Sequence, residues 1–146
     1  MAFVSQSLDA QEPVVAPEGR YTLRVVKSEH AVYERSGRER TRITLQIVSD
    51  DETDYELFNY DLMCVKPGDK PTFVKMRTLE NQRALTALNC PFEDTGWDPD
   101  DLVGCEASNI LVTQEVMQNS DGEDLTDDEG NLRVRNVPVW PKLPSR

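Results

Sequence analysis

Residues 33–48 read YERSGRERTRITLQIV and join a turn to the clearest strand pattern in the chain. In the second half, Ile43, Leu45 and Ile47 alternate with polar side chains. Alternation with a period of two is typical of a β-strand with one buried face. The Ser-Gly pair at 36–37 favours a turn, because glycine readily adopts positive φ angles. The stretch therefore predicts a β-hairpin whose second strand faces a core.

The segments on both sides of this hairpin repeat the alternation. In residues 19–33, Tyr21, Leu23 and Val25 alternate with other side chains, and residues 55–63 (YELFNYDLM) follow an acidic turn. Three such strands joined by short turns predict an antiparallel meander.

The sequence does not decide which face of the third strand is buried. Phe58, Tyr60 and Leu62 share one face, and Leu57 lies on the other. If the first face is inward, these three side chains belong to the core. If the opposite face is inward, Leu57 becomes core, and Phe58 and Tyr60 become platforms on which bases could stack.

The second half of the chain predicts one helix and two more strands. Residues 71–89 begin with proline, which suits the first turn of a helix. Its expected apolar stripe consists of Phe73, Met76, Ala84, Ala87 and Leu88. Strands are expected at 102–116, with Ile110 and Val112 inward, and at 132–140.

This order predicts an all-β fold class that is β-rich with one helix. We expect a five-stranded antiparallel barrel, because closure hides the edges of a sheet. A helix between strands three and four is the layout of an oligonucleotide-binding (OB) barrel. The expected parts are an extended N-terminal arm (1–18), an OB-fold domain (19–142) with an acidic loop (118–131), and a C-terminal tail (143–146).

Charge is strongly segregated along this acidic chain. The formal net charge is −11, yet residues 20–42 carry a local balance of +4. Acidic residues concentrate in 50–56, 93–101 and 121–129. Segregation of this kind is the precondition for one basic face on an acidic protein.

No sequence pattern indicates catalysis, a metal site or a cofactor. There is one histidine, and no phosphate loop or nucleophile motif occurs. Cys64, Cys90 and Cys105 are widely spaced, which favours reduced thiols in the cytoplasm. No apolar run approaches the length of a membrane span, and no signal peptide is evident. We therefore expect a cytoplasmic protein, in the host cell if viral, that is not an enzyme.

Several motifs resemble phage-encoded single-stranded-DNA-binding proteins of the OB fold. The similar stretches, which together span about residues 17–142, are PEGRYTLRVVKSE, SGRERTRITLQIV, ALTALNCP, DLVGCEASNILV and NVPVWPKLP. The resemblance implies a protein of a replication or recombination module that binds single-stranded DNA and performs no chemistry on it.

Single-stranded DNA needs cations for its phosphates and flat side chains on which its bases stack. Arginine offers both, because its guanidinium pairs with phosphate and stacks on π-faces. The candidate DNA-binding residues are Arg24, Tyr33, Arg35, Arg38, Arg40, Arg42, Gln46, Arg133 and Arg135. A purely structural alternative is a solvated hairpin whose arginines pair with Glu34, Glu39 and the acidic loops.

Other functions remain open at this stage. The acidic loop could cover the basic groove until DNA displaces it, or dock replication or recombination proteins. A β-barrel with a long arm would also suit a virion structural or protein-interaction subunit, and its charge would suit an acidic DNA mimic. The sequence does not decide whether the chain forms a homo-oligomer.

Overall fold

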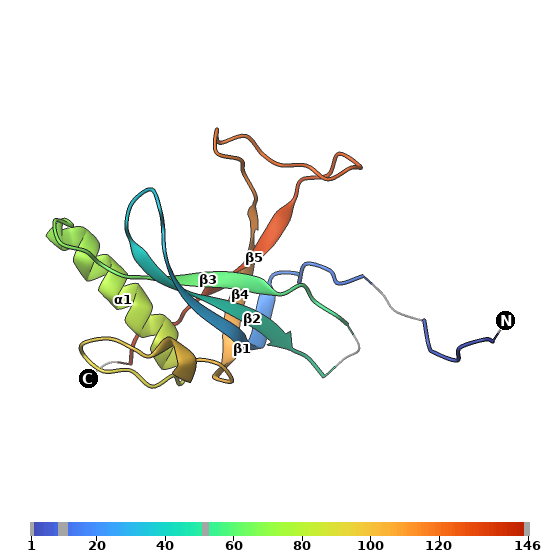
Figure 1. Ribbon diagram of the computed structural model, residues 1–146, viewed down its shortest axis with the longest axis horizontal. Coiled ribbons are helices and arrows are strands. Elements are labelled where there is room, and N and C mark those ends of the chain that lie inside the picture. The colour runs from blue at the N-terminus through green and yellow to red at the C-terminus, as the bar shows by residue number, and fades with distance from the viewer. Residues whose placement is uncertain (1, 9–11, 51–52, 145–146) are drawn as a thin grey trace.

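The computed structural model describes residues 2–8, 12–50 and 53–144. In this part of the chain one antiparallel sheet and one α-helix form the body (Figure 1). The elements are β1 (Gly19–Val32), β2 (Glu39–Val48), β3 (Phe58–Met63), α1 (Pro71–Ala87), a short 3-10 helix (Pro99–Asp101), β4 (Glu106–Val116) and β5 (Val134–Val139). The predicted β-rich fold with a helix between the third and fourth strands is confirmed.

The five strands lie in the order β3-β2-β1-β4-β5, so β3 and β5 are the two edges. The long strand β1 pairs with both β2 and β4, and its register shifts between Val25 and Lys27. Such bulges bend a strand. The two edges approach each other, as the contact between Tyr60 and Trp140 shows: their rings meet edge to face, with 5.4 Å between the centroids. Among the described residues no ladder joins these edges, so the sheet is curled but not closed.

The core lies on the inner face of the curled sheet. The predicted inward residues include five that are fully buried, namely Leu23, Val25, Ile43, Leu45 and Val112, while Ile47 and Ile110 are nearly so. The third strand turns Phe58 and Leu62 inward and leaves Leu57 54% exposed. Phe58 and Tyr60 are therefore on the core side, and the alternative in which they form an outer stacking surface is wrong.

Helix α1 packs against β3 and β4 mainly through its C-terminal half. Asn81, Ala84 and Leu85 are its buried residues, whereas the predicted stripe residue Met76 is half exposed. That part of the predicted stripe is wrong, because the first turns of the helix extend past the sheet that would cover them (Figure 1). Within the described residues, no helix is both long enough and apolar enough to cross a membrane.

The N-terminal arm has two parts with different surroundings. Residues 2–8 lie far from the sheet, and Phe3 is 93% exposed (Figure 1). By contrast, Ala16 is fully buried, and Val14 forms a bridge with Tyr55. The backbone N–H of Ala16 donates to Oδ1 of Asn136, and its carbonyl accepts from Nδ2 of the same side chain, both at 2.9 Å. The second part of the arm is thus held by the body of the protein.

The acidic loop forms an ordered extension between β4 and β5 (Figure 1). It contains two turns of the same kind, which start at Asn119 and Asp127. In each, the first side chain accepts two backbone N–H bonds at 2.9–3.0 Å, and the fourth residue is a glycine with φ of +81° or +86°. Only glycine adopts this φ without strain. The hydrogen bonds found for residues 118–132 all join partners within 117–133.

We expect Asn136→Ala to lower the free energy of unfolding by about 1–3 kcal/mol. The buried backbone N–H of Ala16 would lose its partner, whereas the carbonyl would keep the hydrogen bond from Nε2 of Gln114 at 2.9 Å. Chemical denaturation monitored by circular dichroism measures the change. Asn131→Ala, an exposed asparagine on the acidic extension, is the control and should alter stability by less than about 0.5 kcal/mol. Equal effects of the two changes would contradict the role assigned to Asn136.

Candidate nucleic-acid interface

The outward face of β1, β2 and β3 carries a row of polar side chains. Because Ile43 and Leu45 point into the core, their neighbours Arg42, Thr44 and Gln46 point outward. Gln46 lies opposite Arg24 of β1. The row continues along β2 to Arg40 and then to Tyr33, at the start of the β1–β2 turn. Five of the candidate residues are therefore assembled on one face.

Asp61 of β3 is the centre of the charged end of this row. Its Oδ1 accepts from Nε of Arg42 at 2.8 Å, and its Oδ2 accepts from Nη2 of the same side chain at 3.1 Å. Oδ2 also accepts from Nη1 of Arg40 at 3.2 Å and from the hydroxyl of Tyr33 at 3.0 Å. One carboxylate thus faces two guanidinium groups, and the cluster keeps one net positive charge.

Ionisation of this cluster follows from its contacts. Burial opposes the charged form of Asp61, but the hydrogen bonds from Arg42 and Tyr33 outweigh it and lower the pKa of Asp61. The hydrogen bond with Asp61 in turn raises the pKa of Arg42. Asp61 and Arg42 are therefore both charged at neutral pH.

Tyr33 and Arg40 form a stacked pair. The guanidinium carbon of Arg40 lies 3.8 Å from the centroid of the Tyr33 ring, and Nη1 of Arg40 donates to the Tyr33 hydroxyl. This contact is a cation–π interaction in a half-buried position. The guanidinium of Arg40 covers one face of the Tyr33 ring. A base would therefore stack either on the other ring face or on the outer plane of the guanidinium.

Arg38 has a different role from its neighbours. Nη1 and Nη2 donate to the two carboxylate oxygens of Asp69 at 2.9 Å each, and Nη1 also donates to the carbonyl of Cys64 at 3.0 Å. The guanidinium lies 4.9 Å from the centroid of the Phe73 ring. Hydrogen bonds from Arg38 and from the backbone of Lys66 lower the pKa of Asp69 to about 2. Arg38 therefore ties the β1–β2 turn to the start of α1.

The remaining candidates lie at the tip of the turn or at another part of the molecule. Arg35 is exposed in the turn, whereas Arg24, already placed in the row, pairs with Glu106 at 3.1 Å. Arg135 pairs with Glu115 of β4 at 3.3 Å, and Arg133 is exposed where the acidic extension meets β5. The strand order separates these last two residues from β2 by two strands.

Sequence reasoning missed the acids that hold the arginines. It named Glu34, Glu39 and the acidic loops as alternative partners, whereas Asp61 and Asp69 take that role. The alternation of β3 indicates that Asp61 points outward, but its position opposite Arg42 follows only from the register of the two strands. Asp69 lies in the turn between β3 and α1, where no periodic sequence pattern could identify it as a partner of Arg38.

Within the described ranges, no group of three or more histidine, cysteine or acidic side chains is arranged to hold a metal ion. Cys64, Cys90 and Cys105 are free thiols. Burial raises the pKa of the Cys64 thiol and, more strongly, that of Cys90. On the outward face of the sheet, the side chains that can contact a ligand are the arginines, Tyr33 and the polar row.

No protein-family model matches the chain, and a search of curated proteins finds no match either. The geometry of these side chains is therefore the basis for a proposed function.

We expect Asp69→Asn to lower the thermal midpoint at pH 7 and to do so less as the pH falls. The folded pKa of Asp69, about 2, lies below its ordinary value of 3.8, so its ion pair stabilises the fold above pH 4 and is lost between about pH 4 and pH 2. The difference in midpoint between parent and variant, measured from pH 6 to pH 2, should shrink toward zero. Asp128→Asn, on the exposed acidic extension, should show a small difference throughout. A gap for Asp69→Asn that does not change with pH would contradict this assignment.

Proposed function

We propose that the protein binds single-stranded DNA without strong sequence preference and performs no chemistry on it. The supporting observation is the row from Arg24 and Gln46 through Arg42 and Arg40 to Tyr33 on one outward face. Guanidinium groups can pair with phosphates, and the Arg40–Tyr33 stack offers planar groups to bases. With the resemblance described above, this row favours a role in a phage replication or recombination module, in the host cytoplasm.

The fold proposal that accompanies this function is an OB-type barrel. The meander of three strands, the helix between β3 and β4, and the contact of Tyr60 with Trp140 across the two edges all support it. OB folds bind oligonucleotides on the face of strands two and three and in the loops after strands one and four. In this chain those places correspond to the polar row, to the turn with Arg35, and to the acidic extension.

The ion pairs set the character of the proposed binding. Arg24 and Arg42 keep 44% and 40% of their side-chain surface exposed, so phosphates can reach them without unfolding of the cluster. Their carboxylate partners lower the local positive charge. We therefore propose binding of modest affinity that depends strongly on salt.

A second candidate function is that of a protein-interaction subunit, such as a component of a virion. The observation that favours it is the distal arm, where Phe3, Val4 and Leu8 are all highly exposed. Apolar side chains on an extended segment suit a contact with another chain. The acidic extension gives the same candidate a second projecting surface, and a DNA mimic would use those acids in place of phosphates.

We expect the double change Arg24→Gln and Arg42→Gln to weaken oligonucleotide binding and to flatten its salt dependence. Each lost phosphate contact should reduce the slope of log affinity against log salt by roughly 0.7, so two contacts give about 1.4. Fluorescence anisotropy with a labelled oligothymidylate at several salt concentrations measures both quantities.

The control for this experiment is Lys75→Gln with Lys142→Gln, which removes two exposed positive charges away from the row. It should leave the slope nearly unchanged. A parent protein that does not bind single-stranded DNA would overturn the proposal and favour the interaction subunit.

Tyr33 provides a separate test of stacking. Tyr33→Ala should lower the affinity by about 1–3 kcal/mol with little change in salt slope, because stacking involves no counterion release. Tyr33→Phe keeps the ring and loses only the two hydrogen bonds of the hydroxyl, to Asp61 and from Arg40, so it should retain most of the affinity. Equal losses in the two variants, measured in the same titrations, would show that the hydroxyl and not the ring supports binding.

A further inference from the structure

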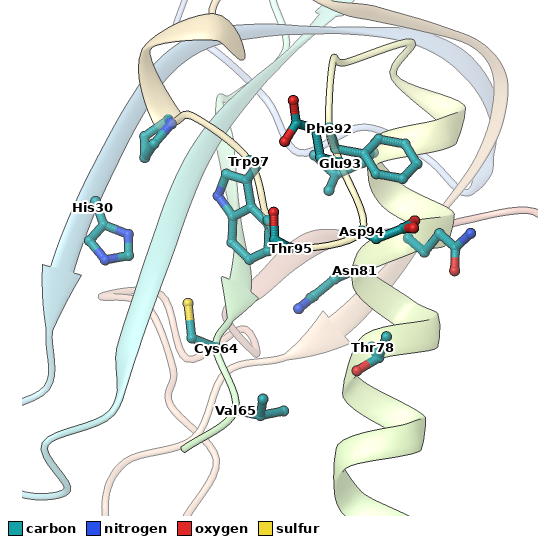
Figure 2. Close-up of a pocket in the computed structure, with 14 residues that line it drawn as sticks. His30, Cys64, Val65, Thr78, Asn81, Phe92, Glu93, Asp94, Thr95 and Trp97 are labelled. Atoms are coloured by element: carbon teal, nitrogen blue, oxygen red, sulfur yellow. The ribbon is translucent and has the colours of Figure 1, made fainter. Parts of the chain in front are cut away.

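A cleft of about 620 Å³ opens between helix α1 and the loop that follows it (Figure 2). Thr78 and Asn81 line it from the helix, and Phe92 and Trp97 line it from the loop. His30, near the end of β1, lies across the cleft from the helix (Figure 2). This volume is within the range of sites that bind small molecules or single side chains. The cleft uses none of the residues of the polar row.

The aromatic wall of the cleft is held in place by its own contacts. Nε1 of Trp97 donates to the hydroxyl of Thr41 at 2.9 Å, and this fully buried hydroxyl also lies 2.9 Å from Nδ1 of His30. The turn before Trp97 is closed by two backbone hydrogen bonds between Glu93 and Gly96, at 2.8 and 3.1 Å. The indole is therefore positioned before any ligand arrives, which lowers the entropic cost of binding.

The buried wall of the cleft presents an unused hydrogen-bond acceptor. Asn81 is only 8% exposed, and its Nδ2 donates to the carbonyl of Met63 at 2.8 Å, which fixes the orientation of the amide. The Oδ1 atom is buried and has no hydrogen-bond partner. A buried acceptor without a partner costs free energy that a donor on a ligand would recover. Because the atom exposes almost no surface, the ligand would reach it after a small shift of the surrounding side chains.

The charge at the cleft selects between kinds of ligand. Glu93 and Asp94 place two exposed carboxylates at the loop side, and none of the lining residues is a lysine or arginine. A phosphate would meet repulsion there, whereas a cation would be attracted. The face of a tryptophan ring is the best aromatic partner for a cation.

We propose that this cleft binds an arginine side chain of a partner protein. A guanidinium is planar, carries five N–H donors and stacks on aromatic rings. It can therefore lie against Trp97 or Phe92, pair with Glu93 or Asp94, and donate to Oδ1 of Asn81. This interaction does not depend on the proposed binding of DNA, because the two sites share no residue.

The test uses two short peptides, acetyl-Gly-Arg-Gly-amide and acetyl-Gly-citrulline-Gly-amide, titrated into the full-length protein. Citrulline keeps the shape of arginine and lacks its charge. Two-dimensional NMR follows the indole N–H of Trp97 and the side-chain amide of Asn81. We expect saturable shifts of both signals with the arginine peptide, and binding at least about tenfold weaker with citrulline. Absence of saturable shifts, or equal binding of the two peptides, would overturn the proposal.

A charge variant completes the test without disturbing the core. Glu93→Gln with Asp94→Asn should weaken binding of the arginine peptide about three- to tenfold at low salt. Asp127→Asn with Asp128→Asn removes the same charge from the acidic extension and should leave binding unchanged. Thymidine 5′-monophosphate is the third ligand. If it shifts the same signals more strongly than the arginine peptide does, the cleft takes a nucleotide and the proposal is wrong.

Discussion

The carboxylate of Asp61 is the contact on which the outward face of the sheet depends. It joins β3 to Arg42 and Arg40 of β2 and to Tyr33 after β1, so three consecutive chain segments meet at one acid. Without it, two guanidinium groups would lie side by side with no counter-charge, and like charges repel. With it, both arginines and the tyrosine ring have fixed directions. Binding of a ligand to these fixed side chains costs less side-chain entropy than binding to arginines that must first be ordered.

The same ion pairs explain how an acidic chain can carry a cluster of arginines. Each pair orients an arginine and also cancels part of its charge, so the row keeps a small positive excess instead of a strong field. Burial then divides the roles. Arg38 and Arg40 are mostly covered and hold the turn and the Tyr33 ring, whereas Arg42 is more exposed and has an edge that a phosphate can approach. Arginines that look equivalent in the sequence thus serve structure and binding to different degrees.

Local patterns predicted the strands well because each strand carries its own alternation. Ile43, Leu45 and Ile47 specify an inward face without reference to any distant residue, and the structure buries all three. The partners of the arginines could not be read this way, because the Arg42–Asp61 pair depends on the register between two strands. The position of Trp97 was even less predictable from local sequence patterns. Trp97 lies in a segment that reads as an acidic loop, and its indole is fixed by Thr41, 56 positions earlier in the chain.

Segregation of charge along the chain becomes segregation in space through the topology. The hairpin of β1 and β2 carries its arginines on the outward face of the sheet, while the loop after α1 places Glu93 and Asp94 beside Trp97. A polyanion is therefore favoured at the first surface and disfavoured at the second, and a cationic side chain has the opposite preference. The two proposed sites have opposite charge preferences, so a polyanion at one and a basic side chain at the other would not compete. The negative net charge repels polyanions over the whole surface, so only a local excess of positive charge such as the arginine row can offset it.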